Sequence, residues 1–313
     1  MLEVLTQSVI ARAALLATAL SWSQPLGCHQ LSGLNVGPYH REGQDPALGT
    51  RIPDAQLTVD VTVAALASRR LRFYGCDDVL ERAVRIAKSF PEELRPEVAL
   101  GAWIGSDAAS NERQLSCLAR VCGEGLCDLA IVGTEALLRG DVSEATLLTH
   151  LARTKEALPN VPVTTADVYG VLLDHPAVLD AVDVVMAHVY PFWDGVRIDR
   201  AVRHLHERYL ELKAAAGDRE VVVGETGWPS CGQTVGEAVP NGINAAFYLH
   251  HAVTWSRVEG VTMYWFALFD EPWKAQHEGA VGRCWGLLES DYTAKAGIDA
   301  VFDDERPGPS DGW

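Results

Sequence analysis

Two glutamates occupy similar places in the sequence, each just after an apolar run that closes with a glycine. Glu135 follows LAIVGT and Glu225 follows VVVG. A carboxylate in such a place is costly to bury unless it is paired or functional. One such glutamate alone would be explained as a solvated rim residue or a helix-cap partner. Two of them, beside aromatic-rich segments, indicate acid–base or nucleophilic chemistry.

Enzymes that break glycosidic bonds usually do so with a pair of carboxylates. In double displacement, one carboxylate attacks the anomeric carbon and the other protonates the leaving oxygen, with the two groups about 5–5.5 Å apart. The acid needs a raised pKa, which we expect from the charge of the neighbouring carboxylate and from partial burial. A much larger separation of Glu135 and Glu225 would contradict this mechanism.

The elements that must position these glutamates read as alternating strands and helices. The predicted strands are Leu34–Tyr39, Leu71–Gly75, Val98–Ile104, Leu129–Glu135, Val161–Tyr169, Val182–Tyr190, Val221–Trp228 and Val261–Phe269. The clearest predicted helices are Gln56–Ser68, Val79–Ser89, Asn111–Val121, Ser143–Leu158, Asp199–Ala215 and Ile243–Arg257. Apolar runs of this kind are typical of parallel strands covered on both faces.

Eight strand–helix units predict an α/β fold, a single (β/α)8 TIM barrel, spanning residues 31–304. In this fold the strand ends that carry both glutamates face the active site. An open dinucleotide-binding sheet would place a G-x-G-x-x-G turn after the first strand, and GPYHREGQDP lacks it. A sugar-phosphate barrel would place a glycine-rich phosphate loop near the last two strands, where GWPSCG and FDEPWK stand instead.

Composition narrows the class of ligand. The 313 residues carry a net charge of −16, which argues against nucleic acid and an anionic membrane surface and is compatible with a neutral polysaccharide. The seven cysteines form no C-x-x-C pair, which disfavours a zinc ribbon or a thioredoxin-type site. We expect Cys117, Cys122 and Cys127 to be buried, inert thiols, with a local disulfide between Cys122 and Cys127 as the alternative.

The two ends of the chain are predicted to lie outside the barrel. Residues 1–30 form an N-terminal extension in which Ala13–Trp22 is apolar and follows Arg12. This run fits a signal-peptide core and equally a helix that caps the barrel floor, since Glu3 stands where a signal peptide prefers positive charge. Residues 305–313 are a polar tail. An extracytoplasmic or secreted location is favoured.

Several motifs together resemble one known family. GETGWPS around Glu225 and FALFDEPWK in the last strand are the most specific, and LNVGPY, LRFYGCDD, IVGTEALLR and CWGLLESDYTAK extend the likeness from about Leu34 to Lys295. These motifs resemble glycoside hydrolase family 17, the β-1,3-glucanase and β-1,3-1,4-glucanase family, and we interpret the chain as a bacterial-type member.

The resemblance implies a retaining (β/α)8 hydrolase of β-1,3-glucan that needs no metal or cofactor. Glu225 corresponds to the nucleophile and Glu135 to the general acid/base. The expected partner is a β-glucan polysaccharide or oligosaccharide, not nucleic acid or a membrane, and the protein is expected to be a monomer. The motifs leave open an endo- or exo-hydrolase, a transglycosylase with the same residues, and a non-catalytic glucan-binding barrel.

A further set of residues is expected to bind substrate: Thr134, Tyr74, Tyr190, Trp228, Phe269, Glu271 and Lys274. Thr134 stands where the resembled family usually has asparagine, and a hydroxyl is shorter and differently shaped. Glu271 and Lys274 match the family's acidic and basic pair, for which a structural ion pair at the rim is an equal interpretation. Softer expectations, each with a packing or capping alternative, fall on His188, Asp167, Trp193 and Trp265. Arg139 is expected to belong to a helix start near the acid/base rather than to the chemistry.

Overall fold

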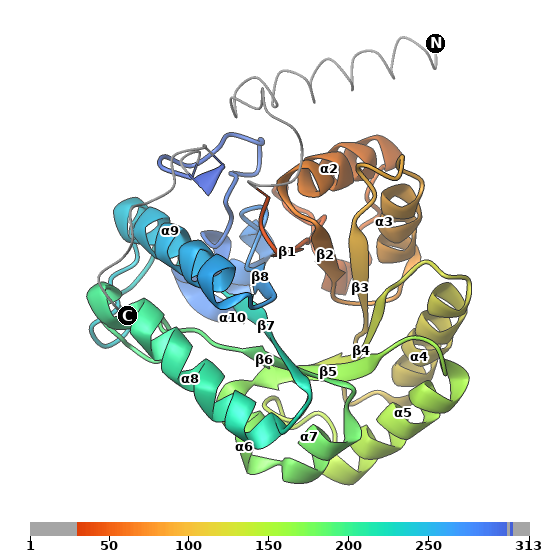
Figure 1. Ribbon diagram of the computed structural model, residues 1–313. Coiled ribbons are helices and arrows are strands. Elements are labelled where there is room, and N and C mark those ends of the chain that lie inside the picture. Colours follow the sequence, from red (N-terminus) through yellow and green to blue (C-terminus); the bar gives the residue numbers. More distant parts are fainter. Residues whose placement is uncertain (1–29, 299–300, 303–313) are drawn as a thin grey trace, which may run out of the picture.

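The computed structural model describes residues 30–298 and 301–302, and it forms a closed barrel of eight parallel strands in chain order (Figure 1). The strands are β1 (Gly33–Asn35), β2 (Arg70–Phe73), β3 (Glu97–Ala102), β4 (Leu129–Thr134), β5 (Val163–Val168), β6 (Val184–His188), β7 (Glu220–Thr226) and β8 (Met263–Trp265). Pairing of β1 with β8 closes the barrel. The predicted (β/α)8 fold is confirmed. The expected signal segment and polar tail fall outside the described residues.

Helices surround the strands on the outside of the barrel (Figure 1). The long ones are α2 (Asp54–Ala67), α3 (Asp78–Lys88), α4 (Ala108–Gly123), α5 (Glu144–Ala157), α8 (Ala201–Ala216) and α9 (Gly242–Glu259). All six correspond to predicted helices. Side chains cap several N-termini, and Asp77 accepts from the Val79 and Leu80 N–H groups. Three short helices were not predicted: α6 (Tyr169–Asp174), α7 (Pro176–Ala181) and α10 (Ala275–Glu278).

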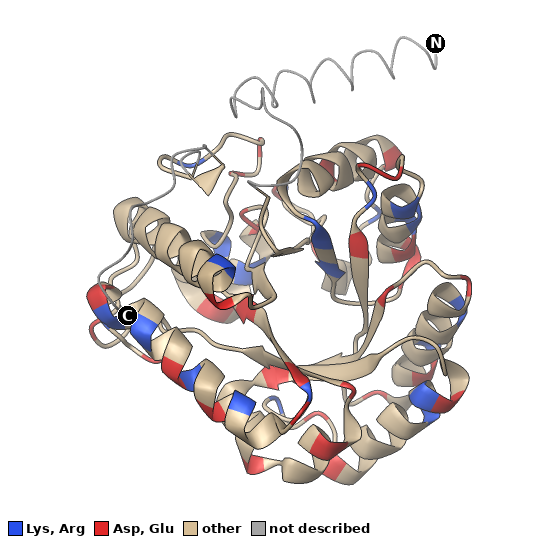
Figure 2. Ribbon diagram, viewed as in Figure 1, with Lys and Arg blue, Asp and Glu red and all other residues tan. Residues whose placement is uncertain are grey.

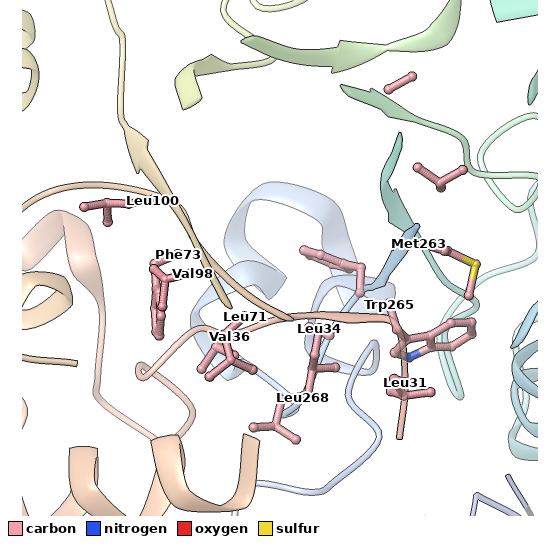
Figure 3. Packing of buried hydrophobic residues seen from close by; sticks show 14 of the residues in the cluster. Leu31, Leu34, Val36, Leu71, Phe73, Val98, Leu100, Met263, Trp265 and Leu268 are labelled. Carbon is pink, nitrogen blue, oxygen red and sulfur yellow. The ribbon is translucent and has the colours of Figure 1, made fainter. Parts of the chain in front are cut away.

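Alternate strand residues face two different cores. A small cluster of Ala99, Ile131, Ala166, Met186, Val222 and Tyr264 fills the barrel interior. The larger cluster lies between strands and helices, and Figure 3 shows part of it, including Leu71, Phe73, Val98 and Leu100. Figure 2 shows most charged residues on the outer helices and loops. Since Leu71 and Phe73 belong to the outer core, Arg72 between them faces the interior.

The last strand is much shorter than predicted. The prediction ran to Phe269, but β8 ends at Trp265 because the chain beyond it pairs with the closing segment. Ala267 N–H donates to the Trp285 carbonyl at 3.1 Å, and Leu288 N–H donates to the Leu268 carbonyl at 2.9 Å. This second layer of pairing places the FALFDEPWK segment over the rim of the barrel rather than in its wall.

The described residues form three disulfides. Cys76–Cys117 joins a loop to α4, Cys122–Cys127 joins the end of α4 to the loop before β4, and Cys231–Cys284 joins two loops. The expectation of inert thiols at Cys117, Cys122 and Cys127 was therefore wrong, and the alternative of a local disulfide between Cys122 and Cys127 is confirmed. Cys117 bonds a cysteine 41 residues away, which the local spacing did not indicate. Among the described residues, no helix combines the length and the apolar character needed to cross a membrane.

Candidate active site

Both glutamates lie at the carboxyl ends of their strands, where the regular pairing breaks. The register of β4 against β5 shifts between Ile131 and Thr134, and that of β6 against β7 shifts at His188. Gly133 adopts φ 82° and Glu135 φ 53°, and such irregularities re-aim side chains at strand ends. The Glu135 N–H donates to the Ala166 carbonyl at 2.7 Å, which fixes the turn that carries the carboxylate.

The Glu225 carboxylate is almost completely buried and both of its oxygens are engaged. Arg72 Nη1 donates to Oε1 at 3.0 Å, and His188 Nε2 lies 3.2 Å from the same oxygen. The Tyr190 hydroxyl donates to Oε2 at 2.7 Å. Burial and the charge of Glu225 raise the pKa of Tyr190 well above its usual value, so its hydroxyl stays a donor. These contacts hold the carboxylate in one orientation.

His188 connects the two glutamates. Its Nδ1 lies 2.7 Å from Glu135 Oε1, and the Glu135 side chain is 28 % exposed whereas the imidazole is fully buried. One oxygen of Glu135, one nitrogen of His188 and one oxygen of Glu225 all lie within 4.8 Å of one another. Carboxylate oxygens this close are compatible with the separation of about 5–5.5 Å between the carboxyl groups of retaining hydrolases.

Arg72 is the cation at the centre of the site. Besides Glu225, its guanidinium donates to the Gly224 carbonyl at 2.9 Å and to the Thr134 hydroxyl at 3.2 Å. It also contacts His188 Nε2 at 3.1 Å. A Cβ at Gly224 would lie 2.7 Å from Met186 Cγ and 3.4 Å from Arg72 Nη1, so a larger residue there would crowd Met186 and the guanidinium. Arg72 therefore binds the ends of β4 and β7 to each other through the barrel interior.

The pKa of Glu135 moves opposite to the expectation. Burial raises it, but the hydrogen bond and charge of His188, with smaller contributions from Arg72 and Arg139, outweigh burial and lower the pKa overall. The expected increase was wrong because the sequence did not place a histidine and two guanidiniums beside this carboxylate. His188 Nδ1 faces the Glu135 carboxylate and Nε2 faces the Arg72 guanidinium, so the imidazole lies between these two side chains.

Glu135, His188 and Glu225 also present the donor types of a metal site. Arg72, however, already supplies positive charge to the same Glu225 oxygen and the same His188 nitrogen. A divalent cation there would sit beside a buried guanidinium and be repelled by it. The arrangement therefore fits a site built on protein charges.

The predicted substrate-binding residues divide into two groups. Tyr74, Tyr190 and Thr134 surround the two carboxylates, and the Tyr74 ring lies 4.8 Å from the Arg72 guanidinium carbon. The buried Tyr74 hydroxyl forms no hydrogen bond of standard geometry with the described residues. Burial and the charge of Glu225 raise its pKa.

Glu271 and Lys274 form a buried ion pair at the rim, with 2.6 Å between Oε2 and Nζ. The Lys274 ammonium lies 4.1 Å from the centre of the Phe266 ring, and Trp273 donates to Glu271 Oε1 at 3.2 Å. The Lys274 ammonium also lies 6.0 Å from the centre of the Tyr74 ring, and the charge of Glu271 contributes to raising the pKa of Tyr74. The position of the Glu271–Lys274 pair fits both a structural ion pair at the rim and an electrostatic role in the site.

The second group of predicted residues is buried by the protein itself. Trp228 packs on Phe192 and donates to the Val239 carbonyl at 3.1 Å, and Phe269 stacks on His40. Trp265 lies in the outer core (Figure 3). None of the three leaves a ring face for a sugar, so this placement does not support them as stacking platforms. Trp193, in contrast, is 41 % exposed.

Asp167 and Arg139 support the turn after β4. Asp167 accepts from the N–H groups of Leu137 and Leu138, so it caps this turn rather than facing open space. Arg139 donates to the Thr134 and Ile104 carbonyls and also lies close enough to lower the pKa of Glu135. Sequence reasoning missed Arg72, although an arginine inside the apolar run LRFYG was a usable signal.

The barrel, the two close carboxylates and the cation that holds one of them define the class as a retaining-type glycoside hydrolase. Residues 33–286 match the BtgE/BtgC glycoside hydrolase domain, and the chain belongs to this family. The predicted family relationship is thereby confirmed at the level of family-17-like β-1,3-glucanases.

Fungal proteins are among the most similar relatives. The chain is 31 % identical over 231 residues to glucan 1,3-beta-glucosidase BGL2 of Candida albicans, covering 66 % of this chain and 74 % of that protein. It is 28 % identical over 300 residues to the probable glucan endo-1,3-beta-glucosidase btgC of Aspergillus fumigatus, covering 85 % of this chain but only 42 % of that protein. The chain thus spans less than half of btgC.

Solved structures agree with the fold. A Rhizomucor miehei beta-1,3-glucanosyltransferase, studied as an active-site mutant with laminaritriose, has a TM-score of 0.73 and 26 % identity, covering 87 % of this chain and 98 % of that one. An endo-laminarinase from Formosa has a TM-score of 0.75 at 19 % identity, covering 91 % of each chain, and supports the fold alone.

Proposed function

We propose that the protein hydrolyses β-1,3-glucan by double displacement, with Glu225 as nucleophile and Glu135 as acid/base. The observation that carries this proposal is the geometry of the two carboxylates: one oxygen of Glu135 and one oxygen of Glu225 lie within 4.8 Å of each other. The names of the relatives support the substrate: two act on 1,3-β-glucan, and the transferase was solved with laminaritriose. The bacterial-type assignment gains no support from these fungal relatives.

In the first step, Glu225 attacks the anomeric carbon and the bond to the leaving oxygen breaks. Glu135 transfers a proton to that oxygen, and a covalent glycosyl ester on Glu225 remains. In the second step, Glu135 removes a proton from water, whose oxygen displaces Glu225 and restores the starting configuration. Arg72 and Tyr190 donate to the two oxygens of Glu225 and hold the carboxylate oriented for attack.

Each remaining polar group has a place in this scheme. His188 binds Oε1 of Glu135, so the proton exchanged with substrate is carried by Oε2. The Tyr74 hydroxyl, whose pKa responds to Glu225, and the Thr134 hydroxyl, which accepts from Arg72, are assigned to binding the reacting sugar. The buried Glu271–Lys274 pair supports this end of the site through its contacts with Phe266 and Trp273.

The Glu225→Gln variant tests the proposal. Laminarin hydrolysis should fall by at least about a thousandfold, since the nucleophile is lost while the shape is kept. Glu220→Gln is the matched control, because Glu220 is an exposed glutamate at the opposite end of the same strand. Full activity of Glu225→Gln, or no turnover of any β-glucan by the unaltered protein, would refute the proposal.

A second candidate function is glucan transfer, in which a sugar hydroxyl replaces water in the second step. The Rhizomucor transferase favours it, because its whole chain superimposes on this barrel. Incubation with short laminari-oligosaccharides distinguishes the outcomes. Products longer than the substrate indicate transfer, glucose alone indicates exo-cleavage, and a ladder of shorter products indicates endo-cleavage.

We also propose an extracytoplasmic location. The support is the set of three disulfides, because such bonds persist in oxidising compartments and are rare where thiols are kept reduced. N-terminal sequencing of the mature protein tests this proposal. A mature chain that begins at Met1 and is recovered with free thiols at these six positions would contradict it.

A further inference from the structure

One aromatic residue beside the acid/base remains exposed. Trp103 directly follows β3 and is 44 % exposed, whereas Phe266, Tyr190 and Trp285 around the nucleophile are each less than a tenth exposed. An exposed indole held against a catalytic rim has a ring face free for a ligand. Isolated exposed aromatics are ordinary on protein surfaces, so the case depends on how this ring is held and on which side of the site it lies.

The Trp103 ring is fixed by Arg139. The guanidinium carbon lies 4.4 Å from the ring centre, so the cation covers one face of the indole. The same guanidinium donates to the carbonyls of Thr134 and Ile104, and its Nε bonds Asp141 at 2.7 Å. The ring is therefore tied to the turn that carries the acid/base, and its other face is free.

The backbone of Trp103 is fixed as well. Its N–H donates to Gln114 Oε1 at 3.1 Å, and the same oxygen accepts the Cys76 N–H at 2.7 Å. The neighbouring disulfide ties Cys76 to Cys117 on α4, the helix that supplies Gln114. The ring is thus preorganised, which lowers the entropic cost of using it as a binding surface.

The position of Trp103 indicates which sugar it would contact. In double displacement the acid protonates the oxygen of the departing sugar, so that sugar lies on the Glu135 side. Trp103 follows β3, which pairs directly with β4, the strand that leads to Glu135. On its other edge β3 pairs with β2, the strand of Arg72, so strand order alone does not decide the side. The Arg139 guanidinium decides it, because it covers the Trp103 ring and binds the Thr134 carbonyl next to Glu135. Trp103 therefore lies on the leaving-group side of the scissile bond.

We propose that Trp103, backed by Arg139, is the stacking platform for the leaving-group glucosyl unit and for the sugar acceptor that enters the same place. This inference rests on the proposed function. A glucosyl unit held over the free indole face would occupy the path that water takes to the glycosyl ester. The platform would therefore favour transfer to a sugar over hydrolysis and would set how tightly the distal part of the glucan is bound.

The experiment compares two substrates with the Trp103→Ala variant. In laminaripentaose the leaving group is a sugar, which would lie over Trp103. In β-laminaribiosyl fluoride the leaving group is a fluoride ion, which is too small to stack on the ring. For the pentaose, kcat/KM should fall about tenfold, as expected for losing one apolar ring contact. Hydrolysis of the fluoride should be unchanged, and the yield of transfer products with added laminaribiose should fall. Trp103→Tyr should restore most of both losses.

Leu138→Ala is the matched control, because Leu138 is 52 % exposed on the same turn as Arg139. It should leave both substrates unaffected. Equal losses for pentaose and fluoride in both Trp103 variants would show a structural role and overturn the inference, as would unchanged pentaose cleavage and transfer. Turnover of neither substrate by the unaltered protein would instead refute the proposed function, and the platform with it.

Discussion

Two buried clusters in this molecule place a histidine between oxygen atoms, yet only one of them is arranged for chemistry. In the first, His188 stands between Glu135 and Glu225. In the second, which we call the His40 cluster, His40 lies 2.9 Å from the Ser290 carbonyl and 3.0 Å from Asp60, and the Tyr292 hydroxyl donates to Asp60 at 2.7 Å. Both histidines are completely buried.

The difference lies in access and in the number of carboxylates. In the His40 cluster, Asp60 has no exposed surface and its oxygens are occupied by His40, Tyr292 and Gln56. Both ring nitrogens of His40 face oxygen atoms, and the contacts of His40 with Ser290 and of Tyr292 with Asp60 attach the closing segment to α2. Around His188, a second carboxylate reaches solvent. Burial of an ionisable group therefore indicates a catalytic site only where one partner can still meet a substrate.

Loss of the more exposed carboxylate, Glu135, should have the largest effect on activity, and it tests the contrast between the two clusters. Glu135→Gln should lower kcat/KM on laminarin by about 10²–10⁴-fold, the range for a general acid–base group. With β-laminaribiosyl fluoride, whose leaving group needs no acid, added azide should attack the glycosyl ester without a base, restore turnover and yield a β-laminaribiosyl azide detectable by mass spectrometry. A loss below about tenfold would place the acid function on another residue.

A substitution in the His40 cluster should lower the stability of the fold rather than the activity. Asp60→Asn removes one partner of a buried pair and should lower the free energy of unfolding by about 3–5 kcal/mol, measured by urea denaturation. Asp180→Asn is the control, because Asp180 pairs with Arg219 on the surface and should cost less than about 1 kcal/mol. If Asp60→Asn left stability unchanged but abolished catalysis, the distinction between the two clusters would fail.

A pH profile tests the link between His188 and the acid. Because the hydrogen bond and charge of His188 lower the pKa of Glu135, His188→Gln should raise that pKa. Glu135 must be protonated to act as acid, so the alkaline limb of kcat/KM should move to higher pH. The histidine control His150→Gln, on α5, should leave the limb in place. A shift to lower pH would contradict the assignment.

The same shift has a consequence for stability. The pKa of Glu135 is lower in the folded protein than its ordinary value, so this carboxylate stabilises the fold above the ordinary glutamate pKa. That contribution is lost as the pH falls through the lowered value. Acid unfolding of His188→Gln, followed by circular dichroism, should therefore show a weaker contribution of Glu135 to the pH dependence.

The sequence predicted the order of the barrel because parallel strands leave apolar runs that are readable one at a time. All eight strands and six long helices lie where those runs indicated. The strand ends were overestimated, most clearly at Phe269, because apolar residues that pair over the rim look the same as those in the wall. The short α6 and α7 carry too little periodicity to be read.

Of the site, the sequence predicted the groups next to recognisable motifs and missed those that come from elsewhere. Glu225 and Tyr190 were expected and are in contact. Arg72 was missed because one arginine in a strand does not reveal that it meets residues 62 and 153 positions away. The direction of the Glu135 pKa depended on those distant charges, and so the prediction from two carboxylates alone was wrong.

The smallest effect expected concerns Thr134, where the resembled family has asparagine. Its hydroxyl accepts from Arg72 at 3.2 Å, so it supports the cation that holds Glu225. Thr134→Ala should lower kcat/KM by about fivefold, the equivalent of about 1 kcal/mol for one hydrogen bond. Thr134→Ser keeps the hydroxyl and should stay near the unaltered value. Equal losses in both variants would mean that the methyl group, not the hydroxyl, is what the site requires, and Arg72 would then be oriented by Glu225 and Gly224 without help from β4.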